Sequence, residues 1–341
     1  MRDKIRFLLI YLYVSAPPSD NKLWKRGCFT APSRGLEMVV ASLISGPALG
    51  LRHSAFIRHY RATPVVCLNR LLLEESECRI MKPENKLVAD LGAADPRAVH
   101  VRKVLRAENG QTVRAGVLDK GRSDAATVRW VGAAGGQDSA LRLNLGAADE
   151  LLRTATESER PRVDLLLCMP RPLQFSRLLP MISSLGVSTL WVTEAAKTPK
   201  AFFSSHLLRK DKEDELRAAL VEGVTQAGDT VVPRVRVRRD MRRLVEEELE
   251  GYAHKLLCHP ARDGSTPTIS SVLRDIDGQG RVLLAVGPEG GWEEPRELEL
   301  LQGCGFRQVT LGRRTLRTDV AVASLLAVAH ECLGPDEYTW M

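Results

Sequence analysis

The sequence predicts an α/β protein in which a small β-barrel-like domain precedes a mostly parallel sheet covered by helices on both faces. From residue 163 onward, apolar runs such as VDLLLCM (163–169) alternate with longer segments of helical spacing, which is typical of parallel sheets. Residues 67–150 instead contain short β-like runs separated by Gly and Asn-Gly. At 341 residues, with 44% apolar and 27% charged residues, the chain is long enough for two folded domains.

The first 66 residues differ from the rest of the chain in charge. They hold ten of the 49 basic and three of the 42 acidic residues, so 39 of each remain and the net charge of +7 belongs to this leader. Its Arg, Ser, Ala and Pro content predicts a transit peptide and a location in a chloroplast or mitochondrion, with the cytoplasm expected if it is untargeted. The run FLLIYLYVSA suggests a secretory signal as an alternative. Because the remaining chain is neutral, any RNA-binding surface on it must be local.

The cysteines and histidines predict no metal site. None of the seven cysteines forms a C-x-x-C pair, and the seven histidines form no clustered pattern. Dispersed cysteines are typical of a reducing compartment and argue against secretion. Since no run of 18 apolar residues occurs, we expect no membrane-spanning helix and no membrane partner.

The smaller domain, 67–150, is expected to contain five strands and one helix. The strands are predicted within 69–75, 86–92, 111–119, 125–133 and 141–146. The helix is predicted over 98–110, with Asn109-Gly110 as its C-cap. Residues 151–162 are polar and contain Pro161, which predicts a linker.

The larger domain is predicted over 163–335 as alternating strands and helices. Strand-like runs occupy 163–169, 187–194, 231–237, 254–260, 281–291 and 307–312, and helical segments occupy 173–186, 204–228, 238–251, 292–305 and 318–333. In such sheets a ligand binds beyond the carboxyl ends of the strands. Functional residues are therefore expected where these strands end.

Two loops at such strand ends share one design. GPEGGW (287–292) and LGRRTLRTD (311–319) each follow an apolar strand, contain Gly and lead into a helix. Backbone N–H groups are free to bind a ligand at such junctions, and glycines allow close approach. The Walker and dinucleotide-binding glycine patterns are both missing. A purely structural turn is the alternative interpretation of GPEGG.

The two loops, in this order and about twenty residues apart, resemble the signature of the RsmE family, the small-subunit rRNA uridine-N3 methyltransferases. Residues 100–121 and 68–75 resemble that family's PUA-like N-terminal module, so the resemblance covers about 67–333. It implies a SPOUT fold with a trefoil knot, S-adenosylmethionine as cofactor, homodimers with each site at the subunit interface, and small-subunit rRNA as partner. It places the cofactor against Gly287, Pro288, Glu289, Gly290, Gly291, Leu311, Gly312, Leu316, Thr318 and Thr193.

The implied chemistry predicts which side chains are catalytic. Methylating uridine N3 requires loss of a proton and in-line attack on a sulfonium methyl, and a guanidinium suits the negative charge that develops on the uracil oxygens. Arg317 is the first candidate and Arg314 the second, while Asp319 or Glu289 positions the uracil or assists proton removal. The alternative interpretations are a surface ion pair for Arg317 with Asp319, and a backbone-binding loop carboxylate for Glu289.

Local basic groups predict the RNA contacts. The candidates are Arg102, Lys103, Arg106, Arg171, Arg177, Arg234 and Arg236. A solvated charged face is an equal alternative for 234–243, because Glu246–Glu248 follow closely.

The chain also departs from the family's pattern. Gln174, Ser184, Ala195 and Asp229 stand where the better-known bacterial members carry other residues. These departures leave two alternatives open: a methyltransferase of this fold for another RNA site, and a non-catalytic RNA-binding ribosome-assembly factor. The target nucleotide and its ribosome also stay open.

Overall fold

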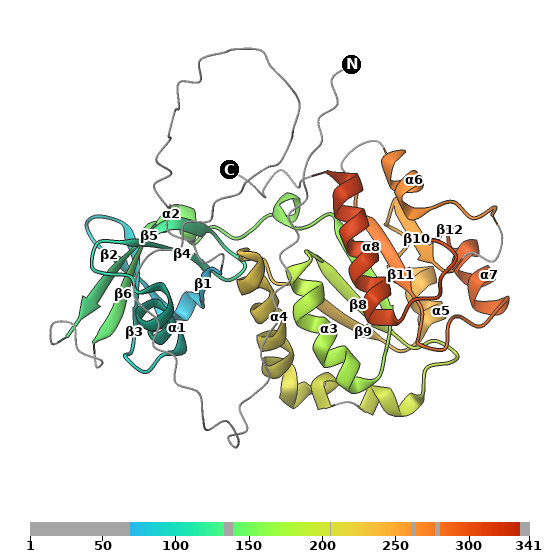
Figure 1. Cartoon of the computed structure of the whole chain (residues 1–341), viewed down its shortest axis with the longest axis horizontal. Coiled ribbons are helices and arrows are strands. Elements are labelled where there is room, and N and C mark those ends of the chain that lie inside the picture. The colour runs from blue at the N-terminus through green and yellow to red at the C-terminus, as the bar shows by residue number, and fades with distance from the viewer. Residues whose placement is uncertain (1–68, 133–138, 205, 261–263, 277–279, 335–341) are drawn as a thin grey trace, which may run out of the picture. The chain divides into compact units, whose positions relative to one another are not determined.

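The computed structural model describes residues 69–132, 139–204, 206–260, 264–276 and 280–334 (Figure 1). The predicted leader, 1–66, lies outside these residues, so targeting stays a prediction. Within the described chain, two six-stranded sheets follow one another in sequence. No helix in this part of the chain is long and apolar enough to cross a membrane.

The first sheet is built from residues 71–147. Its strands are β1 (Leu71–Leu73), β2 (Cys78–Met81), β3 (Lys86–Leu91), β4 (Thr112–Val117), β5 (Arg122–Val131) and β6 (Ala140–Ala147). Their order is β1-β4-β5-β6-β3-β2, with β1 parallel to β4 and every other neighbour antiparallel. Alternate apolar residues fill one core, as Leu141, Leu143 and Leu145 of β6 show. Helix α2 (Ala148–Leu151) follows directly.

Two details of this sheet differ from the prediction. The helix expected over 98–110 is α1 (Pro96–His100) with a wider turn over Val101–Leu105, and it ends where Arg106 adopts a φ of +51°. Asn109 does not cap it, because its side-chain oxygen accepts a hydrogen bond from the Trp130 N–H at 2.6 Å. Strand β2 was not predicted, since it is an outer strand with exposed residues and shows no apolar alternation.

The second sheet is wholly parallel, which confirms the predicted α/β class. Its strands are β7 (Val163–Cys168), β8 (Thr189–Thr193), β9 (Arg234–Arg238), β10 (His254–Cys258), β11 (Val282–Val286) and β12 (Phe306–Val309). The order is β12-β10-β11-β7-β8-β9, so β11 lies between β7 and β10.

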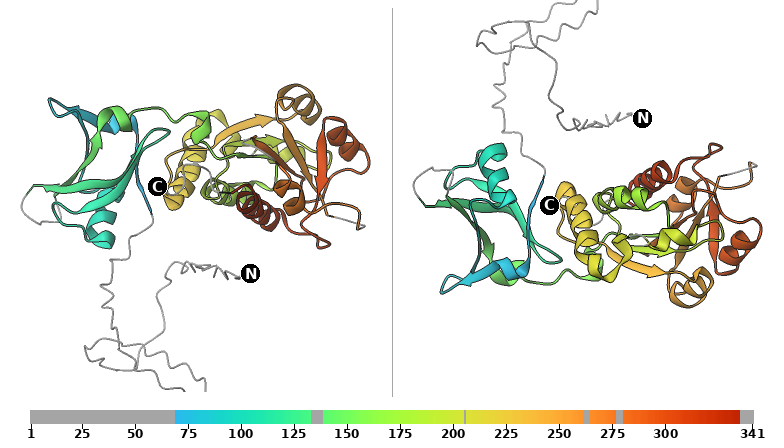
Figure 2. Two further views of the ribbon diagram at one scale, coloured as in Figure 1. Left: turned by 90° about the horizontal axis from the view of Figure 1, so that it is seen from above. Right: turned by 90° about the horizontal axis from the view of Figure 1, so that it is seen from below.

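Helices cover both faces of this sheet, as both views in Figure 2 show. They are α3 (Pro172–Ser184), α4 (Glu213–Ala227), α5 (Met241–Arg243), α6 (Ile269–Arg274), α7 (Arg296–Gly303) and α8 (Thr318–Leu333). Helix α4 begins nine residues later than predicted, after short 3-10 turns, and three acidic residues occupy its first turn, where the helix dipole favours them.

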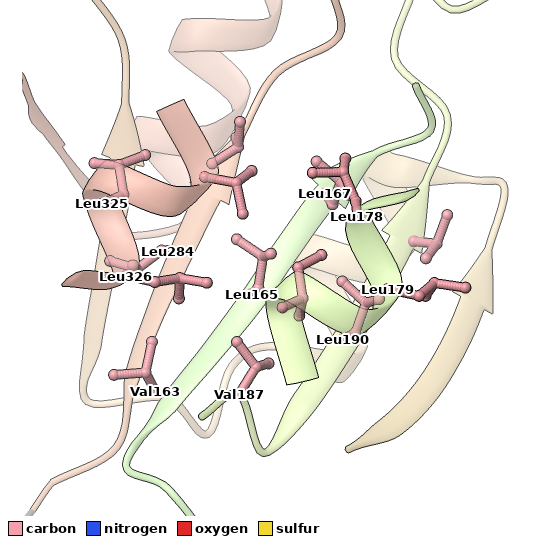
Figure 3. Close-up of a cluster of buried hydrophobic side chains, with 14 of the residues drawn as sticks. Val163, Leu165, Leu167, Leu178, Leu179, Val187, Leu190, Leu284, Leu325 and Leu326 are labelled. Atoms are coloured by element: carbon pink, nitrogen blue, oxygen red, sulfur yellow. The ribbon is translucent and has the colours of Figure 1, made fainter. Parts of the chain in front are cut away.

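The core of the parallel sheet has two halves because side chains alternate across each strand. Leu165 and Leu167 of β7 face α3 and α8 (Figure 3), while Leu166 and Cys168 belong to the cluster on the other face. Both faces of β7 and of β11 are fully buried, so these strands carry apolar residues at nearly every position.

Candidate active site

A cavity of about 710 Å³ lies beyond the carboxyl ends of β7, β10, β11 and β12. It is lined by both glycine-containing loops, by the first turns of α3 and α8, and by residues 258–260 at the end of β10. Parallel strands bring their carboxyl ends to one edge of the sheet, which is why segments far apart in sequence meet there.

Most of the predicted site residues line this cavity, including all four catalytic candidates. They are Arg171, Arg177, Gly287, Pro288, Glu289, Gly291, Leu311, Gly312, Arg314, Leu316, Arg317, Thr318 and Asp319. The expectation that ligands bind at the carboxyl ends of parallel strands, together with the two glycine-containing loops, therefore predicted most of the residues that line this cavity.

Thr193 does not line the cavity, so its role as a cofactor ligand stays a prediction. Its side chain is fully buried at the end of β8, which lies beyond β7 on the side away from β11. Gly290 belongs to the glycine loop but is not among the lining residues, and its carbonyl faces Lys197 instead.

The first loop folds back on itself through a tight turn. The Gly291 N–H donates to the Pro288 carbonyl at 2.8 Å, and Gly291 has a φ of +71°, which favours glycine. Gly287 is small for a different reason, because a Cβ there would lie 2.9 Å from the Trp292 indole. The indole is 2% exposed and packs in the core with Leu301 and Phe306. Gly287 thus allows the indole to pack closely against the backbone, and Gly291 allows the tight turn.

The second loop is held by Thr310, which follows β12. Its hydroxyl donates to the Gly312 carbonyl at 2.9 Å and accepts from the Gly312 N–H at 3.0 Å, while Gly312 has a φ of +129°. The loop ends at Arg317, directly before α8, where the Arg317 guanidinium lies 3.0 Å from Asp319 Oδ2. Asp319 Oδ1 also accepts from the Val320 N–H. The ion pair expected as the alternative interpretation is therefore present, and it lies on the cavity.

The start of α3 lies beside the predicted carboxylates of both loops. Arg171 Nε lies 2.8 Å from Glu289 Oε2, and Gln174 lines the cavity together with Asp319. Burial works to raise the pKa of Asp319, but the Val320 N–H, Gln174 and Arg317 outweigh it and hold that pKa below its ordinary value. A carboxylate of lowered pKa is a weak base, so the geometry favours positioning over proton removal for Asp319.

The sequence interpretation missed the contribution of β10. Cys258, His259 and Pro260 line the cavity, although only the strand itself was predicted. Desolvation raises the pKa of the Cys258 thiol to about 12, so it stays protonated. His259 Nε2 lies 3.1 Å from Glu294 Oε1 of the segment after the glycine loop. The sequence could have indicated these residues, because 258–260 lie at the carboxyl end of a strand of the same parallel sheet.

The other missed lining residues come mainly from the elements already named. They are Leu173, Gln174, Val286, Trp292, Val309, Thr310, Thr315, Ala321 and Leu325. Several are apolar residues that periodicity assigns only to the core.

The remaining predicted RNA contacts lie away from this cavity. Arg234 pairs with Glu157, and the Arg236 guanidinium carbon lies 5.4 Å from the centroid of the Trp191 ring. Their strand β9 is an outer strand, where charged side chains discourage unwanted pairing. Its neighbours Arg238, Arg242 and Arg243 pair with Glu248, Glu246 and Glu247, which favours the solvated-face interpretation.

The three predicted contacts of the first sheet lie on the turn after α1. Arg102 lies over the Trp130 ring at 4.7 Å from its centroid, and Lys103 and Arg106 are exposed. Their contact with RNA stays a prediction.

Known proteins resemble this chain in sequence. The family described as RNA methyltransferase domain matches residues 156–330, just over half of the chain. The ribosomal RNA small subunit methyltransferase E of Treponema pallidum is 28% identical over 249 residues, covering 70% of this chain and 84% of the relative. The protein of the same name from Synechocystis is 23% identical over 292 residues, covering 84% and 82%.

A solved structure has the same fold. The ribosomal RNA small subunit methyltransferase E of Neisseria gonorrhoeae, crystallised with S-adenosyl methionine, is 20% identical, with a TM-score of 0.51 over 76% of this chain and 95% of its own. Together with the two sequence relatives, it confirms the resemblance to the RsmE family that the two motifs indicated. The chain therefore belongs to the RNA methyltransferase domain family.

Proposed function

We propose that this protein uses S-adenosylmethionine to methylate N3 of a uridine in small-subunit ribosomal RNA. The observation that carries the proposal is one cavity lined by both motif loops and by four guanidinium groups. These belong to Arg171, Arg177, Arg314 and Arg317. Arginine suits phosphate and anionic oxygen because it stays charged and can bond bidentately.

The residues present fit the cofactor. Gly291 and Gly312 line the cavity, and no described atom outside each glycine and its two chain neighbours lies within 4 Å of the position that a Cβ would take there. Side chains there would occupy a space that a ligand lying against the backbone needs. When bound, the cofactor supplies an electrophilic methyl group on a sulfonium.

The chain's own residues orient the nucleobase. Arg317, held by Asp319 at the mouth of the cavity, faces the negative charge that develops on the uracil oxygens when N3 loses its proton. Arg314 adds a second positive charge from the same loop. Glu289 is held by Arg171, so this pair ties the glycine loop to α3.

Calorimetry and mass mapping of rRNA test the proposal. The purified protein is expected to bind S-adenosylmethionine, and small-subunit rRNA from a deletion strain is expected to lack one N3-methyluridine that the restored gene returns. Loss of a different modification would indicate another RNA site. A protein that binds no cofactor and whose deletion removes no methyl group would instead be an assembly factor.

Two finer fold assignments are also proposed. The first sheet is PUA-like, and the chain from β10 to α8 is a SPOUT trefoil knot. Support for the knot is that β12 lies at the sheet edge beyond β10, whereas α8 packs back over β11 and β7. This return of the chain past α6, against which α8 packs, supports the proposed knot. A crystal structure traced through 261–263 and 277–279 tests this threading.

We propose that the protein is a homodimer joined near the cavity mouth. Apolar side chains stand exposed there, among them Leu173 at 65% and Val320 at 46%. Leu311 and Leu316, which line the cavity, are also more than a third exposed. Sedimentation analysis is expected to give a dimer for the natural protein and a monomer for Leu173→Glu, and a monomeric natural protein would contradict the proposal.

A further inference from the structure

His259 is the histidine among the described residues that line the cavity, and a neutral imidazole can accept a proton. It directly follows β10, and its backbone N–H donates to the Val309 carbonyl at 3.0 Å, which fixes it beside β12. Its side chain is 12% exposed, and its Nε2 lies 3.1 Å from Glu294 Oε1. The fold thus places an imidazole and an orienting carboxylate together across 35 residues of sequence.

The contact with Glu294 determines which ring nitrogen is free. An ionised carboxylate only accepts hydrogen bonds, so Nε2 carries the proton of the neutral ring and Nδ1 keeps its lone pair. Nδ1 has no hydrogen-bond partner among the residues that the structure describes. Nδ1 is also not one of the buried polar atoms without a partner in the described part of the chain, and His259 lines the cavity.

The other ionisable groups that line the cavity are poor proton acceptors. Its four guanidinium groups stay protonated, and the raised pKa of Cys258 keeps the thiol protonated. Glu289 is engaged by Arg171 at 2.8 Å. Asp319 accepts hydrogen bonds from the Val320 N–H and from the Arg317 guanidinium, and its pKa lies below the ordinary value. Among the described lining residues, this leaves His259 with an available basic atom.

We propose that His259 Nδ1 accepts the proton of uridine N3 and that Glu294 is its positioning residue. The inference rests on the proposed function. The N3–H bond breaks, its proton moves to Nδ1 and its electron pair stays on N3. That pair forms the new N3–methyl bond, while the former sulfur–methyl bonding pair stays on the sulfur. Glu294 stabilises the resulting imidazolium, which releases its proton to solvent.

The variant His259→Gln tests this role, because glutamine keeps an N–H donor for Glu294 but has no basic nitrogen. Single-turnover methylation of small ribosomal subunits from a deletion strain is expected to fall by about 10²-fold or more at pH 7, the loss typical for a general base. Affinity for S-adenosylmethionine is expected to stay within about twofold. The deficit is expected to shrink as pH rises, because uridine N3 then ionises unaided.

A matched histidine–glutamate pair away from the cavity provides the control. His206 Nε2 lies 3.4 Å from Glu215 Oε2, and neither residue lines the cavity. His206→Gln is expected to keep the rate and the pH profile of the natural protein. This control separates loss of the cavity base from a general effect of replacing histidine.

A second variant keeps the proposal testable if His259→Gln does not fold. Glu294→Gln removes the negative charge that stabilises the imidazolium, so the base becomes weaker and the rising limb of the pH–rate profile is expected to move to lower pH, with a lower plateau. An unchanged profile in Glu294→Gln, an unchanged rate in His259→Gln, or a rate loss explained by weakened cofactor binding would each overturn the proposal. A natural protein that transfers no methyl group would instead refute the proposed function.

Discussion

At the scale of single residues, Arg317 combines exposure with a defined direction. Its side chain is 77% exposed, yet Asp319 holds the guanidinium beside the cavity at the start of α8. An exposed ion pair of this kind contributes little to stability. In the function that we propose, this pair places a permanent positive charge where the uracil oxygens are expected.

Arg317→Ala is expected to lower methyl transfer by about 10²-fold or more, the loss typical when a stabilising donor is removed. Cofactor affinity is expected to change little, since we propose that the glycine backbone forms the cofactor-binding surface. The neighbouring Arg313→Ala is the control, because Arg313 is exposed and does not line the cavity. Rapid-quench transfer assays with calorimetry distinguish the two effects, and undiminished turnover would disprove a role for Arg317.

Gly287 and Gly251 differ in what surrounds them. A Cβ on Gly287 would meet the buried Trp292 indole, whereas one on Gly251 would meet nothing within 4 Å. Gly287→Ala is therefore expected to lower the free energy of unfolding by about 1–3 kcal/mol, and Gly251→Ala to change it by about 0.5 kcal/mol or less. Urea unfolding measures both. Equal effects would mean that the indole shifts without cost.

At the scale of elements, the loop after β8 anchors the glycine loop from outside the cavity. Lys197 Nζ donates to the Trp292 carbonyl at 2.9 Å and to the Gly290 carbonyl at 3.3 Å. Glu297, only 5% exposed, accepts the Ala196 N–H at 2.7 Å through one carboxylate oxygen. Its other oxygen accepts a backbone N–H of the segment after the glycine loop at 2.6 Å. These bonds fix peptide groups that glycines leave free to rotate.

Lys197→Met is expected to loosen the glycine loop without altering the cavity lining. Loss of two charge-assisted hydrogen bonds on an exposed lysine corresponds to about 1 kcal/mol, or roughly fivefold weaker cofactor binding. Hydrogen exchange of the amides of 287–293 is expected to be faster. Lys200→Met, which changes an exposed lysine in the same segment, is expected to behave as the natural protein. Identical exchange in the two variants would show that Lys197 does not anchor the loop.

At the scale of the whole molecule, an ion-pair cluster in the first sheet is expected to contribute to stability in acid. Arg97 Nη1 lies 2.9 Å from Glu77 Oε2, and Arg97 Nη2 lies 2.8 Å from Asp95 Oδ2. Hydrogen bonds from Arg97 hold the pKa of both carboxyl groups below their ordinary values of 4.5 and 3.8. Carboxylates with lowered pKa stabilise the fold above their unfolded pKa, and this contribution is lost as pH falls through the folded pKa.

The free energy of unfolding is therefore expected to fall as the pH drops below about 4.5. The carboxyl groups of the unfolded chain take up protons at higher pH than the same groups of the folded chain, which favours the unfolded state. Glu77→Gln is expected to flatten this decline and to cost about 1 kcal/mol at pH 7, because the pair is about a third exposed and screened by solvent. Glu84→Gln is the control, because within the described chain Glu84 is an exposed carboxylate that pairs with the exposed Lys86. Urea titrations at several pH values measure both, and parallel curves for Glu77→Gln and the natural protein would contradict the expectation.

The elements were predicted better than their boundaries. Apolar strands such as β7 and β11 are visible in the sequence because both of their faces are buried. Strand β2 escaped notice because its exposed residues show no such pattern, and α1 ended early because Asn109 pairs with β5 instead of capping the helix. Local sequence patterns indicate which residues are buried. The pairing of β2 and the end of α1 depend instead on residues elsewhere in the chain that contact them.

The sequence by itself determined the strand–helix alternation, the parallel sheet and the two loops that line the cavity, because each is encoded by adjacent residues. Only the tertiary structure decided that β11 lies between β7 and β10. That order joins His259 to Glu294 and Arg171 to Glu289 at one cavity, and it leaves Thr193 buried away from it. Strand order depends on how both sheet faces are covered, and no local period in the sequence records it.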